Sequence, residues 1–295
     1  MRNSKMTGDR DLFSGGREKK FPITFTGIFA AAALATVFMA GAAGASTIYF
    51  QGFETDTTDW NTNTNRVASG TGGITSADGN FHAESLGISS WHFFGSGSTA
   101  TSNATIPFTA SLDFYLDMGG SWSNDTRFDY SVALTKPDGN HLRDFVFNAG
   151  FYNDDTVPGA DSDRFVISAS NSAGRGDSYP KNPGRDPISI DTTGWYTFQH
   201  AFFDDGGTLG AMLSVLDSGG TSLSSWSLGT DPIADVGGEG YGWIVNNEFD
   251  RLAYDNTSLT SGAAPVPVPA TLPLLGGGLV LMGFVGWRKR RAIPA

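Results

Sequence analysis

The sequence contains no cysteine, which excludes a disulfide framework, a thiolate metal site and a cysteine nucleophile. Long runs of strong helix formers are also missing and 39 of the 295 residues are glycine, which argues against a helix bundle. Basic side chains are scarce in the middle of the chain, where residues 46–262 hold nine Lys and Arg against 27 Asp and Glu. So acidic a body argues against nucleic acid as a partner, because binding phosphates requires basic residues.

The first 45 residues have the layout of a secretory signal peptide. Three basic residues between positions 17 and 20 precede an apolar stretch over residues 21–42, and the small residues Ala43, Gly44 and Ala45 follow. Signal peptidase accepts such an A-x-A sequence, so we predict cleavage after Ala45 and a mature chain that starts at Ser46. The alternative is a retained N-terminal anchor.

The chain ends in a proline-rich linker, a short apolar segment and a basic cluster. The linker runs to residue 270, and residues 271–287 carry no charge. As a helix they would be about 26 Å long, at the short limit for crossing a bilayer. The basic cluster consists of Arg288, Lys289, Arg290 and Arg291. The positive-inside rule keeps this cluster cytoplasmic and places the acidic body on the outer side, so we expect a sorting signal with a transmembrane helix.

The proline-rich motif just before this span consists of Val266, Pro267, Val268, Pro269 and Ala270. Together with the span and the basic end, over residues 263–291, it resembles the PEP-CTERM sorting domain and is closest to the VPLPA-type subgroup, which usually has Leu where Val268 stands. The resemblance implies an inner-membrane intermediate in a Gram-negative bacterium that makes exopolysaccharide. It also implies processing by an exosortase-type protease and release to the cell surface or matrix. The alternative is an ordinary membrane anchor with a proline linker.

Residues 46–262 contain many short strand patterns separated by turn signals, which predicts one antiparallel β-sandwich domain. Residues 131–135 and 142–148 predict one hairpin, and residues 195–203 and 209–216 predict another. The order of these patterns resembles concanavalin-like and galactose-binding-like jelly rolls, a resemblance that implies architecture only. We therefore expect an all-β fold whose first and last strands lie side by side, flanked by a signal helix and a transmembrane helix.

Catalytic motifs are scarce in this body. Glu248 and Asp250 resemble part of the E-x-D-x-x-E motif of laminarinase-like glycoside hydrolases, but the second Glu is missing. A retaining glycosidase needs two carboxyl groups about 5–5.5 Å apart. The sequence also has no G-x-S-x-G, H-E-x-x-H or P-loop motif. We therefore expect that the chain is not an enzyme. The alternative is an exported, glycan-active hydrolase with an Asp-based site that no motif marks.

Two sets of side chains are candidate metal ligands. The first set consists of His82, Glu84 and His92, which lie near one another in the sequence. The commoner alternative is that such histidines lie at a surface or strand edge and bind no metal. Calcium suits the many acidic loops better, because it prefers oxygen ligands. In calcium-binding jelly rolls, a Glu after the first strand and an Asp on the last often share one ion, and Glu54 and Asp255 match those places. The alternative is ordinary turn chemistry, in which Asp is common.

Three tryptophans are candidates for stacking on sugar rings. Trp91, Trp122 and Trp243 lie beside polar or glycine-rich segments where exposure is expected, whereas Trp195 alternates with Thr197 and is expected in the core. For each of them, core packing is the alternative. The main hypothesis is an exported, non-catalytic protein of the cell surface or exopolysaccharide matrix, with carbohydrate binding as its candidate activity.

Overall fold

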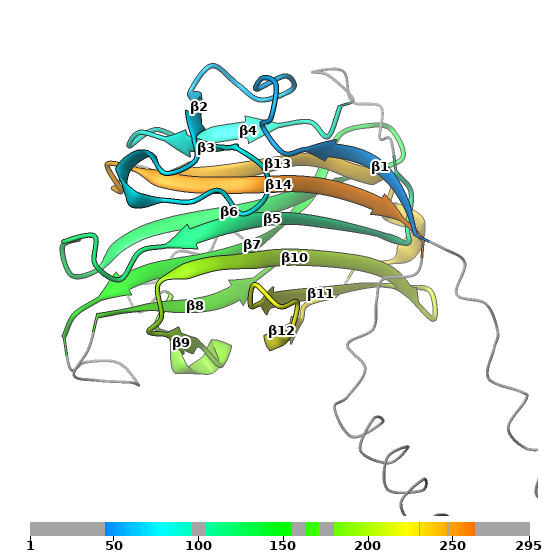
Figure 1. Ribbon diagram of the computed structural model, residues 1–295. Helices are drawn as coiled ribbons and strands as arrows, with labels where there is room; N and C mark the ends of the chain where they lie inside the picture. Colours follow the sequence, from blue (N-terminus) through cyan, green and yellow to red (C-terminus); the bar gives the residue numbers. More distant parts are fainter. Residues whose placement is uncertain are drawn as a thin grey trace, which may run out of the picture. The chain divides into compact units, whose positions relative to one another are not determined.

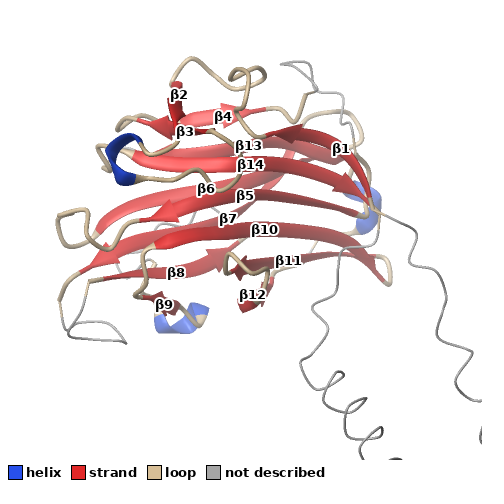
Figure 2. Cartoon of the chain, in the orientation of Figure 1, coloured by secondary structure: helices blue, strands red, loops and turns tan. Residues whose placement is uncertain are grey.

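The computed structural model describes residues 45–95, 104–154, 163–171, 180–229, 231–246 and 248–262. In this part of the chain the strands form two antiparallel sheets, and these pack face to face as a sandwich (Figures 1 and 2). The expected antiparallel, all-β fold is therefore confirmed.

The larger sheet has eight strands. Seven of them form a continuous order: β12 (Ser222–Ser227), β11 (Thr208–Leu216), β10 (Gly194–Asp205), β5 (Phe108–Leu116), β14 (Leu252–Ser261), β3 (Phe81–Ser85) and β2 (Thr64–Ala68). The eighth strand is β1 (Ser46–Gln51). On the edge of β14 opposite to β5, residues 252–254 pair with β3 and residues 257–261 pair with β1. The first and last strands of the body thus lie side by side, as the sequence predicts.

The smaller sheet has six strands. Their order is β4 (Ser90–His92), β13 (Gly238–Asn246), β6 (Thr126–Thr135), β7 (His141–Tyr152), β8 (Arg164–Ser170) and β9 (Ile188–Ile190). Three short 3-10 helices lie in the connections: η1 (Thr71–Gly73), η2 (Pro183–Arg185) and η3 (Ile233–Asp235).

The core lies between the sheets and is rich in phenylalanine. Along β5 the side chains alternate, and Phe114 points inward and is fully buried. Its ring centroid lies 5.0 Å from that of Phe128 in the smaller sheet and 5.0 Å from that of Phe198 in its own sheet. Tyr254 from β14 contacts the same ring at 6.4 Å. The period of two in these strands therefore produces one aromatic core.

Both predicted hairpins are present. Strand β6 pairs with β7 around a turn in which the Lys136 N–H donates to the Asn140 carbonyl at 2.7 Å. Strand β10 pairs with β11 around Gly206 and Gly207, and both glycines have positive φ angles, of 64° and 94°. Glycine reaches this region without steric cost, which is why the Asp-Gly-Gly sequence marks the turn correctly.

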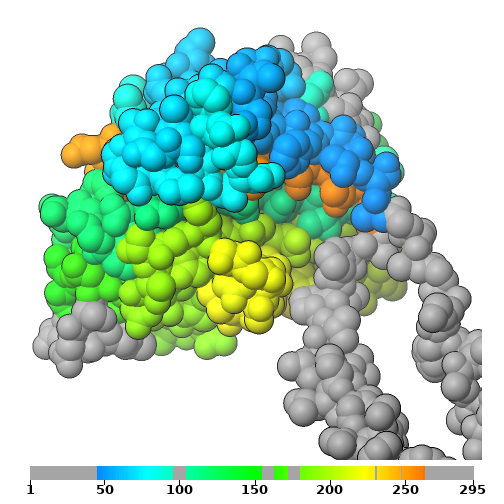
Figure 3. Space-filling model, viewed as in Figure 1, coloured from blue at the N-terminus to red at the C-terminus, as the bar shows by residue number. Residues whose placement is uncertain are grey.

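The segment 69–80 lies over the outer face of the larger sheet, where Figure 3 shows it in cyan. The indole N–H of Trp195 donates to the Thr75 carbonyl at 2.7 Å. Trp195 therefore lies on the outer face, and its predicted place in the core is wrong. The alternation of Trp195 with Thr197 indicates a strand, but it does not indicate which of the two faces the opposite sheet covers.

The two sorting segments fall on residues 1–44 and 263–295, outside the described residues. They include the predicted signal helix, the motif from Val266 to Ala270, the span 271–287 and the basic cluster from Arg288 to Arg291. Within the described ranges, no helix is long and apolar enough to cross a membrane.

Candidate functional site

Two of the three candidate tryptophans lie side by side on the outer face of the smaller sheet. Trp91 on β4 and Trp243 on β13 are direct cross-strand partners. Asn61 binds both backbone groups of Trp91: its N–H donates to the Trp91 carbonyl at 3.0 Å, and its Oδ1 accepts from the Trp91 N–H at 3.3 Å. The backbone of Trp91 therefore points away from β13. In a pair of this non-hydrogen-bonded type the side chains come closest together.

Both indoles face solvent, with exposed fractions of 41% for Trp91 and 39% for Trp243. Their inward neighbours His92 and Ile244 are fully buried, so alternation along the strands fixes the direction of the tryptophans. His92 lies so near Gly242 that a Cβ there would come within 2.2 Å of its Nε2. This glycine lets β4 lie close to β13 and brings the tryptophans together. Single exposed apolar side chains are common, but an adjacent pair of tryptophans indicates a binding surface.

Two further rings continue this surface. Tyr241, two residues before Trp243 on the same strand, has its ring centroid 6.4 Å from the Trp243 ring. Its ring stacks on that of His141, with 6.1 Å between the ring centroids, and its hydroxyl donates to Asp144 Oδ1 at 2.9 Å. Burial and the charge of Asp144 raise the pKa of Tyr241, so the hydroxyl remains protonated at neutral pH. We call Trp91, Trp243, Tyr241 and His141 the aromatic row.

Tyr241 is a residue of this surface that was not predicted, although its sequence context carries a signal. The pattern Tyr241-x-Trp243 inside one strand places both rings on the same face. The contribution of His141 had no such signal, because it depends on how β7 lies relative to β13 across the intervening strand.

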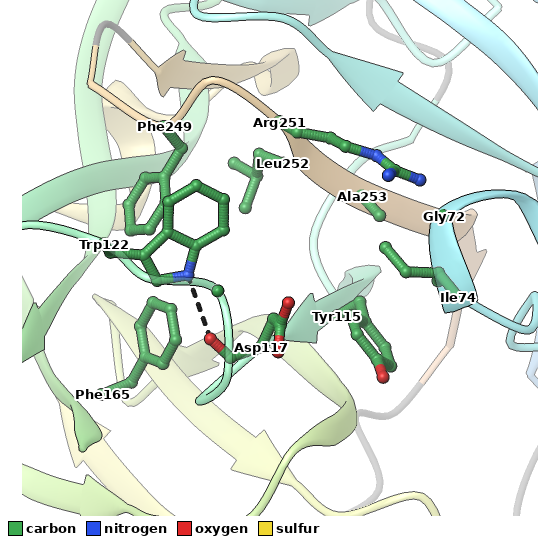
Figure 4. A pocket seen from close by; sticks show the side chains of 11 residues that line it. Gly72, Ile74, Tyr115, Asp117, Trp122, Phe165, Phe249, Arg251, Leu252 and Ala253 are labelled. Atoms are coloured by element: carbon green, nitrogen blue, oxygen red, sulfur yellow. Dashed lines mark hydrogen bonds between the residues drawn. The ribbon is translucent and has the colours of Figure 1, made fainter.

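The third candidate, Trp122, lies apart from the aromatic row, in the wall of a pocket at one end of the sandwich. The pocket has a cavity volume of about 150 Å³. Figure 4 shows Trp122 and Phe249 on one side of it, Ile74 and Arg251 on the other, and Asp117 between them. The Trp122 indole N–H donates to the Asp117 carbonyl at 3.0 Å, and its ring packs edge-on against Phe249 at 5.1 Å.

A chain of polar side chains holds Arg251 at the pocket. Its Nε and Nη2 donate to Glu84 Oε1 at 2.7 and 2.6 Å. The same oxygen lies 3.2 Å from His82 Nε2, and His82 Nδ1 lies 3.1 Å from Ser76 Oγ. Because an ionised carboxylate only accepts, His82 Nε2 carries a proton and donates it to Glu84. Burial opposes ionisation of Glu84, but the bonds from His82 and Arg251 outweigh it and lower its pKa.

The candidate set His82, Glu84 and His92 does not come together as metal ligands. His92 is fully buried with its ring 4.3 Å from that of Trp60, and burial lowers its pKa to about 3. Across the described ranges, no group of three or more His, Asp or Glu side chains could hold a metal ion.

The proposed calcium ligands both bind the segment that covers the larger sheet. Asp255 Oδ2 accepts from the Ala77 N–H at 3.1 Å, and Glu54 accepts from the Asn80 N–H at 3.0 Å. Backbone donors thus satisfy both carboxylates. The donors lower the pKa of Glu54, as expected for a carboxylate held by N–H groups. Their arrangement fits hydrogen bonding to the chain, and calcium at these two residues stays a prediction from sequence.

Asp255 also has a carboxylate neighbour across the sheet. It is the cross-strand partner of Asp113 on β5. Burial raises the pKa of Asp255 to about 7, although the backbone N–H groups that bind its carboxylate lower the pKa. The negative charge of Asp113 raises it further. Burial also raises the pKa of Asp113, although Thr197 and Asn256 donate to it at 2.6 and 3.0 Å. Asp113 and Asp255 are therefore two neighbouring carboxyl groups whose pKa values are both raised.

No family model matches the sequence, and no curated protein matches it. Solved structures with a similar arrangement include an endo-1,3-β-glucanase from Streptomyces sioyaensis, at 11% identity and a TM-score of 0.40, covering 76% of this chain and 99% of the other. A GH131 β-glucanase catalytic domain from Podospora anserina matches at 11% identity and a TM-score of 0.32, and the match covers 62% of this chain and 73% of that domain. Lectin I-B4 from Griffonia simplicifolia matches at 14% identity and a TM-score of 0.27, covering 74% and 98%.

These matches require one correction. The expectation that the chain is not an enzyme is contradicted, because two of the similar structures are glucanases. At TM-scores of 0.40 and below they assign neither an activity nor a ligand to this chain.

Proposed function

We propose that the protein binds polysaccharide along the aromatic row on the outer face of its smaller sheet. The observation that carries this proposal is the exposed cross-strand pair of Trp91 and Trp243. The faces of a sugar ring carry C–H groups and stack on indole, while the hydroxyls at the ring edge stay hydrated or bind polar neighbours. Tyr241 and Asp144 provide such polar groups beside the two indoles.

The charge of the protein favours a neutral glycan. The strongly acidic body repels anionic chains, and carboxylates already hold two arginines of this sheet. Arg127 Nη2 lies 2.6 Å from Asp125 Oδ2, and Arg143 Nε lies 2.6 Å from Asp231 Oδ2. On the outer face, Arg127 is therefore paired with a carboxylate. Arg143 lies on the inner side of the sheet, because it is the cross-strand partner of the buried Leu134. Binding by stacking involves little net charge, so added salt should change it little.

Affinity electrophoresis tests this proposal. Neutral polysaccharides built from glucose, mannose or galactose are cast into native gels beside matched gels with an anionic polyuronate. We expect at least one neutral gel to retard the protein equally at low and high salt, with no retardation by the polyuronate. Retardation only by the polyuronate, or no retardation by any neutral chain, contradicts the proposal.

A second candidate function, hydrolysis of a glycan, is favoured by the Asp113 and Asp255 pair. Cross-strand partners have Cβ atoms about 4.5–5.5 Å apart, which is compatible with the carboxyl spacing of about 5–5.5 Å in a retaining glycosidase. Asp255, whose pKa burial raises to about 7, would be the acid, and Asp113 would be the nucleophile. Asp255 is fully buried beneath the segment 69–80, so this reaction also requires that segment to move aside. Reducing ends released from a retarding polysaccharide by the wild type, and lost in Asp113→Asn, would support this reaction. If the wild type releases none, the pair is only structural.

We also infer, from the sequence motifs alone, that the chain is exported and sorted. Cleavage after Ala45 and near the motif from Val266 to Ala270 would leave a product without the span 271–287. Intact mass spectrometry of protein recovered from the cell surface or medium measures both ends. A released product that still contains Trp287 contradicts the C-terminal processing.

A further inference from the structure

We propose that the pocket beside Trp122 is a second glycan site, which binds a single terminal unit of a neutral hexose. The choice of glycan as the ligand class rests on the proposed function, but the pocket and its residues are separate from the aromatic row. Its cavity of about 150 Å³ suits one ring rather than an extended chain.

Two glycines allow the walls of this pocket to form. A Cβ on Gly120 would come within 2.2 Å of the Trp122 ring, so the indole lies where only glycine leaves room. A Cβ on Gly72 would overlap the Arg251 guanidinium in the same way. The indole and Phe249 form an apolar side, and the opposite side carries the guanidinium (Figure 4). A sugar ring has the same division between an apolar face and a polar edge.

The polar groups of the pocket have unused hydrogen-bonding capacity. Asp117 Oδ1 accepts from the Gly119 N–H at 2.9 Å. Among the described residues, no hydrogen bond reaches Asp117 Oδ2 or the Tyr115 hydroxyl, and both residues line the cavity. A carboxylate can accept from two neighbouring sugar hydroxyls, and charged acceptors form the stronger hydrogen bonds.

The balance of charge in the pocket disfavours acidic sugars. Arg251 supplies a positive charge, but Glu84 holds it at 2.6 Å and neutralises it. The uncompensated charge is then that of Asp117, which would repel a uronate carboxylate. Neutral hexoses keep the stacking face and the hydroxyls without this repulsion.

The test uses simple methyl glycosides, which are too short to bridge the aromatic row. The indole N–H signals of the full-length protein are followed by NMR during titration with methyl glycosides of glucose, galactose, mannose and glucuronic acid. We expect at least one neutral hexoside to shift the Trp122 signal, and the glucuronide to leave it unchanged. No Trp122 shift with any neutral hexoside up to about 50 mM, a weak limit for specific binding, would overturn the proposal.

Matched variants make the test specific. Asp117→Asn keeps an oxygen for the Gly119 N–H but loses the charge, and we expect at least about tenfold weaker binding. Gly120→Ala displaces the indole and should weaken binding similarly, whereas Gly194→Ala, whose Cβ meets only Tyr196 at 4.0 Å, should not. Unchanged affinity in both pocket variants overturns the proposal. Replacing Trp91 and Trp243 should leave hexoside binding intact, so the two glycan sites can fail independently.

Discussion

Replacing both Trp91 and Trp243 with Ala is expected to abolish retention of the protein by neutral polysaccharide gels. Both indoles are exposed and lie side by side, so their removal deletes the stacking surface with little effect on the core. Aromatic side chains that act as anchors contribute about 2 kcal/mol each, which corresponds to roughly a 30-fold loss of affinity per residue. The dissociation constant is read from retardation against polysaccharide concentration.

The matched control is Phe50→Ala. Phe50 is the most exposed aromatic side chain among the large exposed apolar residues, at 58%, but it lies on β1 of the other sheet. We expect this variant to bind as the wild type does, and each single tryptophan variant to bind with intermediate affinity. Undiminished retention of the double variant contradicts the proposal. A change in oligomeric state without a change in retention would instead identify the row as a contact between protein molecules.

Phe114→Ala should cause the largest loss of stability among these variants. Its ring is fully buried and contacts Phe128, Phe198 and Tyr254, so its removal leaves a cavity at the contact between the two sheets. Substitutions of this kind cost about 3–5 kcal/mol in free energy of unfolding. Urea denaturation followed by tryptophan fluorescence measures the loss.

The same Phe50→Ala variant controls for the chemical change. An exposed phenylalanine contributes little to burial, so we expect a free energy of unfolding within about 0.5 kcal/mol of the wild type. Equal losses in the two phenylalanine variants would contradict the assignment of Phe114 to the core.

Local sequence signals predicted both hairpins, which are formed by β6 with β7 and by β10 with β11. The Asp-Gly-Gly turn before β11 and the Pro-Asp-Gly turn before β7 act within a few residues, so the sequence alone identifies them. The alternation along β10 was also correct in period. The face on which Trp195 lies could not be derived, because it depends on where the opposite sheet and the segment 69–80 lie.

The candidate site was only partly predictable for the same reason. The predicted exposure of Trp91 and Trp243 is confirmed, whereas Trp122 is half-buried and packs against the core. Their polar surroundings do not indicate that Trp91 and Trp243 pair or that Trp122 lines a pocket. The pairing brings together residues 152 positions apart in the chain and depends on the close contact of His92 with Gly242. Asp113 and Asp255 meet in the same way, through long-range strand register that no local motif marks.

The most direct test of glycan binding on the smaller sheet is an indole NMR titration with a neutral oligosaccharide that retards the protein as a polymer. Trp91 and Trp243 should shift together with one saturation curve, while the buried Trp60 and Trp226 remain unchanged. Saturable binding of the oligosaccharide that leaves the Trp91 and Trp243 signals unmoved would contradict the account.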